Sequence, residues 1–165
     1  MILAFDAYYT DSFSRIACVQ FESWDSPKPD EVYVAKYGIM EEYTPGEFYK
    51  RELPLITKML SSFELSSVQA IIIDGYVYLD GEGRKGLGAY LYEAVEERLP
   101  VIGVAKTFFE GNAGIEVLRG KSKKPLFVTS EGLPQSVAAG LIQNMHGAYR
   151  IPDILRILDE ASKGR

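Results

Sequence analysis

The stretch QAIIIDG, Gln69 to Gly75, decides the fold. Three consecutive isoleucines after Ala70 indicate a strand that is buried on both faces. Such a strand has no place for a charge along its length, yet it ends in Asp74 and Gly75. In an open α/β sheet, ligands bind at the carboxyl end of a central strand. We therefore expect Asp74 to hold a metal or accept a proton, and Gly75 to let a substrate approach the backbone closely.

The same pattern occurs at the start of the chain. ILAFDAYY, Ile2 to Tyr9, is a second apolar strand, and its only acidic residue is Asp6 near its end. Two apolar strands that each present one aspartate predict a shared acidic site.

The remaining elements complete a mixed sheet. Alternating patterns predict strands over 15–22 and 31–37, which form an antiparallel meander with the first strand. Helical spacing, buried runs and turns predict the later elements: helices over 48–63, 89–99, 135–145 and 153–162, a strand over 100–106, and a hairpin of 115–119 with 125–130. The order predicts an α/β, ribonuclease H-like fold, with three antiparallel strands, then parallel strands, flanked by helices. We expect a single domain over residues 1–165.

Length and charge narrow the functional classes. No apolar run of the 165 residues is as long as a membrane span, and the single cysteine, Cys18, excludes an internal disulfide. We expect a soluble, cytoplasmic protein without a membrane partner. The net charge of −5 weakens the case for general nucleic-acid binding, although bound divalent metal would add positive charge. The basic cluster Arg119 to Lys124 is either a solvated loop or a nucleic-acid contact.

Three acids are placed to form a metal site. In this topology the ends of the first and fourth strands are neighbours, which brings Asp6 and Asp74 together, and Glu52 near the start of the intervening helix supplies a third carboxylate. Such a cluster suits Mg²⁺ or Mn²⁺ and phosphodiester hydrolysis. Lys106, which ends the strand beside the central one, is either a phosphate contact or an ordinary exposed lysine. The aspartates have the simpler alternative of turn residues.

Four motifs resemble the endonuclease V family, which incises nucleic acid near inosine. They are YTPGEFYKRELP (Tyr43 to Pro54), QAIIIDG, IGVAK (Ile102 to Lys106) and AYRIPDILR (Ala148 to Arg156). The resemblance implies a magnesium-dependent endonuclease that acts on DNA or RNA. It places Asp6, Glu52 and Asp74 on the family's acidic metal and catalytic positions and Lys106 on its phosphate-side lysine. It implies two groups of nucleic-acid-binding residues: the strand-separating wedge Tyr43, Thr44, Pro45 and Gly46, and the base-pocket residues Gly75, Gly86 and Leu87.

The chain departs from the family pattern in its histidines. Where the family has His-Pro-Arg, this chain has a run from Asp80 to Lys85, and where the family has Gly-His-Arg, it has Glu131 to Pro134. Its only histidine, His146, falls in a different loop, and we expect no catalytic part for it. Two further hypotheses therefore stay open: a catalytically impaired relative that binds nucleic acid or has a diverged substrate, and a partner-binding domain that merely retains the acids.

Overall fold

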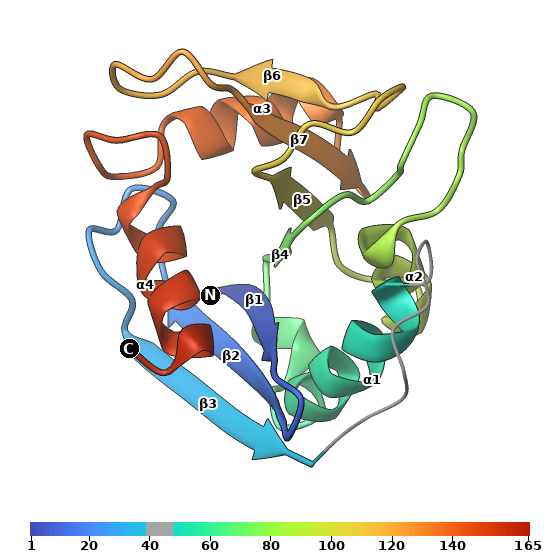
Figure 1. The fold of residues 1–165 in the computed structure, drawn as a ribbon. Helices are drawn as coiled ribbons and strands as arrows, with labels where there is room; N and C mark the ends of the chain where they lie inside the picture. The colour runs from blue at the N-terminus through green and yellow to red at the C-terminus, as the bar shows by residue number, and fades with distance from the viewer. Residues whose placement is uncertain (39–47) are drawn as a thin grey trace.

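A seven-stranded mixed sheet forms the centre of the molecule, with strand order β3-β2-β1-β4-β5-β7-β6 (Figure 1). The computed structural model describes residues 1–38 and 48–165. Its strands are β1 (Ile2–Tyr9), β2 (Ser14–Phe21), β3 (Glu31–Tyr37), β4 (Ala70–Asp74), β5 (Val101–Ala105), β6 (Ile115–Val117) and β7 (Leu126–Glu131). The helices are α1 (Phe48–Leu60), α2 (Leu87–Ala94), α3 (Gln135–Gln143) and α4 (Asp153–Lys163), with a short 3₁₀ helix at Leu65–Ser67.

The pairing confirms the predicted ribonuclease H-like arrangement. β1, β2 and β3 form an antiparallel meander, and β4 lies parallel to both β1 and β5. Phe5 pairs with Ile73, so the next residue on each strand, Asp6 and Asp74, lies at the same level of the sheet. The predicted hairpin of β6 and β7 forms, and β7 also runs antiparallel to β5, which extends the sheet.

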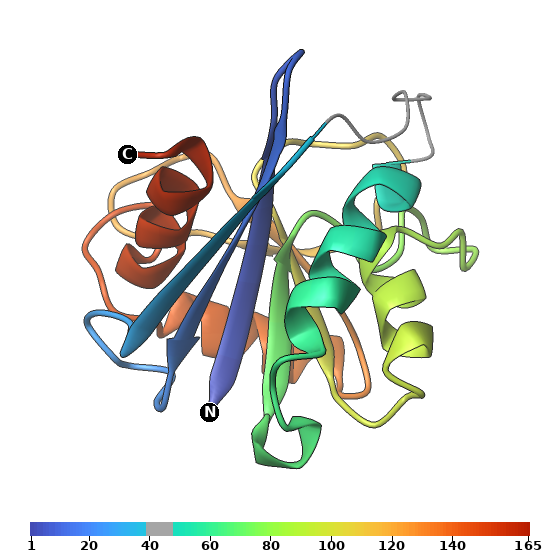
Figure 2. The ribbon, with the colours of Figure 1, turned by 90° about the horizontal axis from the view of Figure 1, so that it is seen from below.

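Helices cover both faces of the sheet, with α1 and α2 on one side and α3 and α4 on the other (Figure 2). Successive side chains of a strand point to opposite faces, and the two cores follow that rule. Leu3 and Phe5 pack with residues of α1 and α2, whereas Ile2 and Ala4 pack with residues of α3 and α4. The isoleucines of β4 contribute to both cores, as expected of a strand buried on both faces.

Two helices differ from the sequence prediction by three or more residues at one end. α1 ends at Leu60 rather than at residue 63. α2 begins at Leu87 and ends at Ala94, where residues 89–99 were expected to be helical. Glu96 and Glu97 have φ angles of 57° and 58°, a left-handed conformation that a right-handed helix cannot contain. The apolar Leu99 extended the helical pattern, but it is buried after the turn.

The described residues include no helix with the length and apolar character needed to cross a bilayer.

Candidate active site

Asp6 and Asp74 lie together at the carboxyl ends of β1 and β4, as predicted. Asp6 is 7% exposed, and its two carboxylate oxygens accept hydrogen bonds from the main-chain N–H of Ala7 at 2.9 Å and from the Ser162 hydroxyl at 2.8 Å. Burial and the nearby charge of Asp74 raise the pKa of Asp6 to about 6. Two carboxylates that repel each other at the edge of a sheet favour a cation between them.

Glu52 reaches this site from α1, on the opposite face of the sheet. Its side chain is 2% exposed, and its Oε2 atom has no hydrogen-bond partner among the described residues. Burial, followed by the charges of Asp6 and Asp74, raises the pKa of Glu52 well above its ordinary value. An unpartnered carboxylate oxygen is costly inside a protein, so this oxygen is suited to binding an ion.

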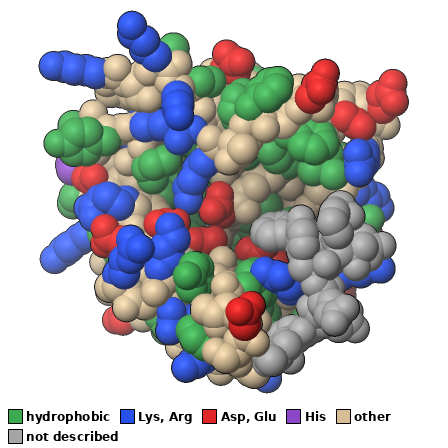
Figure 3. Space-filling view, viewed as in Figure 1, with side chains coloured by type: hydrophobic (Ala, Val, Ile, Leu, Met, Phe, Trp, Pro, Cys, Tyr) green, Lys and Arg blue, Asp and Glu red, His purple; other side chains and the backbone are tan. Residues whose placement is uncertain are grey.

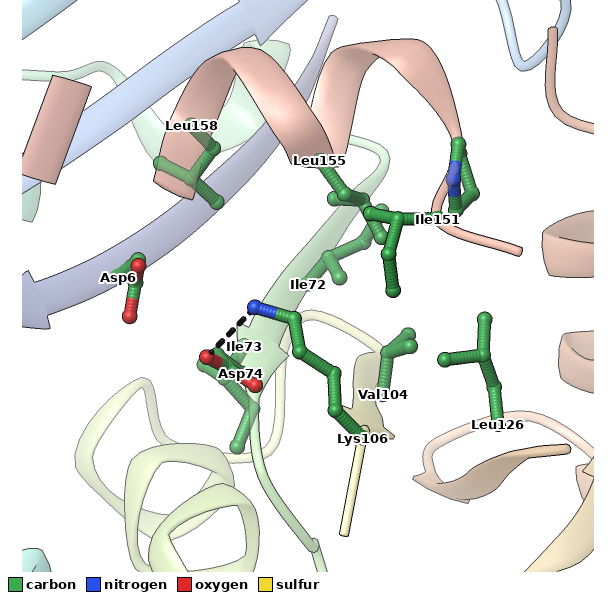
Figure 4. Close-up of a pocket in the computed structure, with 11 residues that line it drawn as sticks. Asp6, Ile72, Ile73, Asp74, Val104, Lys106, Leu126, Ile151, Leu155 and Leu158 are labelled. Atoms are coloured by element: carbon green, nitrogen blue, oxygen red, sulfur yellow. Dashed lines mark hydrogen bonds and ion pairs between the residues drawn. The ribbon is translucent and has the colours of Figure 1, made fainter. Parts of the chain in front are cut away.

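Lys106 reaches Asp74 on the side of the site where Asp6 also lies (Figure 4). Its ammonium group donates to Asp74 Oδ2 at 3.1 Å and to Asp159 Oδ1 at 3.4 Å. Burial disfavours the charge of Lys106, but Asp74 and Asp6 outweigh burial and raise the pKa of the lysine. The aliphatic part of the side chain lies against an apolar wall that includes Val104 and Leu155. Lys106 therefore acts as the counter-ion of the carboxylates in this structure.

Asp159 of α4 is a fourth carboxylate that the sequence analysis missed. Besides Lys106, it accepts a hydrogen bond from Lys163 Nζ at 2.9 Å. Burial acts to raise the pKa of Asp159, but Lys163 and Lys106 outweigh it, so that the pKa is lowered.

Strand alternation explains why α4 meets the acids. Asp6, Asp74 and Lys106 each come two residues after a side chain buried on the α4 side of the sheet; those side chains are Ala4, Ile72 and Val104. Asp159 follows the buried Leu155 by four residues, so both side chains lie on the same face of α4. This helical spacing, taken together with the strand alternation, is the sequence signal that would have identified Asp159.

These acidic side chains are the ligand type that a hard divalent cation prefers, but in this structure they are too far apart to hold one. Among the described residues, no three acidic, histidine or cysteine side chains are close enough together to hold a metal ion. The ammonium of Lys106 lies between Asp74 and Asp159 instead. The carboxylate oxygens of four acids, one of them without a partner, are the ligand type that Mg²⁺ and Mn²⁺ prefer. Asp6, Glu52, Asp74 and Asp159 are therefore the residues that would hold such an ion.

A cleft of about 620 Å³ opens beside the acids. Asp74 and Lys106 form one end of the cleft, and the three predicted base-pocket residues, Gly75, Gly86 and Leu87, all line it. Gly86 is needed for a close approach, because a Cβ atom there would lie 2.5 Å from the carbonyl oxygen of Tyr76. The structure thus places Asp74 and Lys106, two of the four predicted catalytic residues, beside the predicted base-pocket residues.

The basic cluster Arg119 to Lys124 does not act as one surface. Arg119 is 5% exposed, and its guanidinium donates to the main-chain carbonyls of Met145 at 2.6 Å and Tyr149 at 2.8 Å, among others. The hypothesis that this residue contacts nucleic acid is therefore wrong, because its five donors serve the loop between α3 and α4. Lys121, Lys123 and Lys124 follow it in the chain.

Two further predictions from the sequence concern the wedge residues and the single histidine. The wedge Tyr43, Thr44, Pro45 and Gly46 lies outside the described residues, so its role stays a prediction. His146 pairs with Asp153 through Nδ1 and Oδ2 at 2.9 Å, and this partner at the start of α4 is not one of the four clustered acids.

The face that carries the site is divided by charge. In Figure 3, acidic side chains lie at the centre, and Lys and Arg side chains form a band over α4. Arg150, Arg156 and Lys163 line a hollow of about 420 Å³ there, together with Lys106 and Asp159. The acids are thus flanked by cations on the α4 side, in a protein whose net charge is −5.

The chain is similar to known proteins in sequence and in fold. A family model described as endonuclease V matches residues 1–151. No curated protein matches the sequence significantly. Similar solved structures include the catalytic domain of human endonuclease V, with a TM-score of 0.80 and 16% identity over 99% of this chain and 80% of that one. Endonuclease V of Ciona intestinalis, in complex with a 23-mer DNA that contains an inosine, has a TM-score of 0.79 and 17% identity over 99% and 83% of the two chains.

A bacterial structure agrees with these two. Endonuclease V from Streptomyces avermitilis has a TM-score of 0.73 and 22% identity over 99% of this chain and 79% of that one. At such identities the structural likeness establishes the fold, and the family model, which spans 151 of the 165 residues, establishes the family. This chain belongs to the endonuclease V family.

Proposed function

We propose that residues 1–165 form a single domain that acts as a metal-dependent endonuclease, hydrolysing a phosphodiester bond near inosine in DNA or RNA. The observation that carries the proposal is that Asp74 and Lys106, which belong to the acid cluster, line the same cleft as Gly75, Gly86 and Leu87. Family membership supports a nuclease. The inosine-containing DNA bound by the Ciona intestinalis protein supports the choice of substrate.

The proposed metal ligands come from both faces of the sheet. Asp6, Asp74 and Asp159 approach from the α4 side and Glu52 from the α1 side, so together they would surround Mg²⁺ or Mn²⁺. When bound, such an ion lowers the pKa of a water molecule and stabilises negative charge on phosphoryl oxygens.

Lys106 supplies a positively charged side chain next to the carboxylates. Its ammonium lies 3.1 Å from Asp74, so it is placed to donate a hydrogen bond to a non-bridging oxygen of a phosphate that contacts the same acids. A lysine held by carboxylates in the resting protein is charged before the substrate arrives, and the raised pKa of Lys106 favours that charge.

The cleft is the base pocket in this proposal. Its volume of about 620 Å³ accommodates a purine, and the absence of side chains at its glycines lets a base approach the main chain. A pocket of this kind would hold a base that has left the stack. Tyr43 to Gly46 would separate the strands beside it.

One observation favours a second candidate function, nucleic-acid binding without catalysis. The ion pairs of Lys106 with Asp74 and Asp159 satisfy part of the acid cluster without a metal. If those pairs persist with substrate, the cleft would bind inosine and the bond would stay intact.

A cleavage assay separates the two candidates. Labelled oligonucleotides with and without one inosine are incubated with the protein in Mg²⁺, Mn²⁺ or EDTA, beside Asp74→Asn and Glu52→Gln as controls for contaminating nuclease. Metal-dependent cleavage near inosine that both substitutions abolish supports the endonuclease. Tight inosine binding without cleavage supports the binding protein, and neither binding nor cleavage contradicts both.

A further inference from the structure

Two consecutive exposed phenylalanines lie beside the cleft, and the second of them, Phe109, lines it. Phe108 and Phe109 are 64% and 38% exposed and follow Lys106 in the connection between β5 and β6. We call these two side chains the aromatic platform. Figure 3 shows hydrophobic side chains on the upper right of this face, over that connection. Exposed large apolar side chains next to a site commonly mark a binding surface.

The platform is held in place rather than hanging from a loose loop. At its start, the Tyr76 hydroxyl donates to the main-chain carbonyl of Thr107 at 2.9 Å. The Asn112 side-chain amide donates to the carbonyl of Phe109 at 2.7 Å. The Gln135 side chain donates to the carbonyl of Ala113 at 2.6 Å, which ties the loop to α3. Both rings thus stay exposed although the surrounding backbone is fixed.

Neighbouring rings support the platform from below. The ring of Phe109 lies 6.2 Å from that of Tyr76, and the ring of Phe108 lies 5.8 Å from that of Phe127 in an edge-on contact. Phe127 is 5% exposed. An edge-on contact with a buried ring anchors Phe108 and leaves part of its surface open to solvent.

The side chains around the platform are of the types that bind a nucleic acid. Phe109 lines the cleft, and the described residues that line it with Phe109 include three cationic side chains, Arg84, Lys85 and Lys106, against the carboxylate of Asp74. Aromatic faces beside cationic groups are the combination that binds single-stranded nucleic acid, because bases stack on the rings while the cations contact phosphates.

We propose that the aromatic platform stacks an unpaired nucleobase next to the one in the cleft. This inference rests on the proposed function and assigns a substrate-binding role to Phe108 and Phe109, which would favour a single-stranded region of the substrate. In continuous duplex the neighbouring base is stacked within the helix and cannot cover the two rings. The net charge of −5 agrees, because a long duplex footprint needs many phosphate contacts.

Binding measured without catalysis tests the platform. Fluorescence anisotropy in EDTA follows single-stranded DNA and RNA oligonucleotides that contain inosine, and the same strands annealed to complements. Variants with both phenylalanines changed to alanine, or both to leucine, are compared with Tyr33→Ala. Tyr33 is also 38% exposed but lies on β3 at the far edge of the sheet. Circular dichroism melting checks that each variant folds.

We expect wild type to bind single strands more tightly than duplex. The alanine variant should lose roughly 5- to 150-fold in single-strand affinity, the range given by base–aromatic stacking. The leucine variant should lose most of the same affinity, because it keeps an apolar side chain but no aromatic face, and Tyr33→Ala should bind as wild type does.

Three results would overturn the inference: wild type prefers duplex, the alanine variant binds single strands as tightly as wild type, or the leucine variant keeps full affinity. A parallel cleavage assay of wild type in Mg²⁺ separates this failure from failure of the proposed function. Inosine-directed cleavage with unchanged variant binding rejects the platform alone. Absence of both nucleic-acid binding and cleavage rejects the endonuclease as well.

Discussion

Replacing Asp6 with asparagine should stabilise the metal-free protein while removing a ligand of the proposed metal site. Burial and Asp74 raise the pKa of Asp6 from its ordinary value of 3.8 to about 6. One pKa unit corresponds to about 1.4 kcal/mol, so the ionised carboxylate costs on the order of 3 kcal/mol of folding free energy at neutral pH. Asparagine has the same shape without the charge, and therefore avoids this cost.

The hydrogen bonds of Asp6 also survive the change. The asparagine carbonyl accepts from Ala7 N–H, and its amide donates to the Ser162 hydroxyl. That hydroxyl lies 2.9 Å from the carbonyl oxygen of Asp159, to which it would then donate its single proton. No buried polar group loses its partner, so the electrostatic gain is not offset.

The pH dependence has a definite sign. Between about pH 4 and 6 the folded protein binds more protons at Asp6 than the unfolded chain does, because the folded pKa is the higher of the two. The stability of metal-free wild type therefore falls as pH rises through this window. Asp6→Asn should lack the part of the fall that Asp6 causes, whereas the buried Glu52 continues to contribute in the same direction.

Urea unfolding in EDTA at a series of pH values measures both effects. Asp11→Asn, a change to an exposed aspartate in the turn after β1, is the matched control. Added Mg²⁺ should stabilise wild type and Asp11→Asn but not Asp6→Asn. The reasoning is refuted if Asp6→Asn is less stable than wild type at neutral pH in EDTA, or if its stability falls between pH 4 and 6 as steeply as that of wild type.

Other residues give predictions of a different kind. Lys106→Met should lower single-turnover cleavage by roughly 10²–10³-fold, because it removes a preorganised cation from the phosphate; unchanged rates would contradict that role. Arg119→Met should lower the free energy of unfolding by about 3 kcal/mol, because buried carbonyls lose a charged donor, and leave oligonucleotide affinity unchanged in the folded protein. Gly86→Ala should reduce discrimination between inosine and guanosine oligonucleotides in competition binding, since its Cβ would lie 2.5 Å from the Tyr76 carbonyl; equal discrimination would show that the cleft does not read the base.

The sequence was sufficient for the sheet and for the strand pairing that brings Asp6 and Asp74 to the same level. Runs such as AIIID and ILAFD allow few structures other than buried strands, and parallel pairing places their ends together. The base-pocket positions followed from the family resemblance, since glycines in isolation identify no pocket.

The residues that were missed depend on contacts distant in sequence. Asp159 resembles any acid on the polar side of an amphipathic helix until α4 is placed against β1. Arg119 belongs to a basic run, and only the fold of the loop from 144 to 150 buries it. The exposed Phe108 could not be identified from the sequence, because local pattern does not reveal which apolar side chains remain uncovered.

We propose that the carboxylates of β1, β4, α1 and α4 form one divalent-metal site. Electron paramagnetic resonance of Mn²⁺ titrated into the protein tests it most directly, because bound Mn²⁺ loses the signal of the free ion. We predict saturable binding by wild type that Mg²⁺ displaces and that Asp74→Asn and Glu52→Gln each weaken strongly. Wild type that binds no Mn²⁺, or folded variants that bind it as wild type does, would contradict the account.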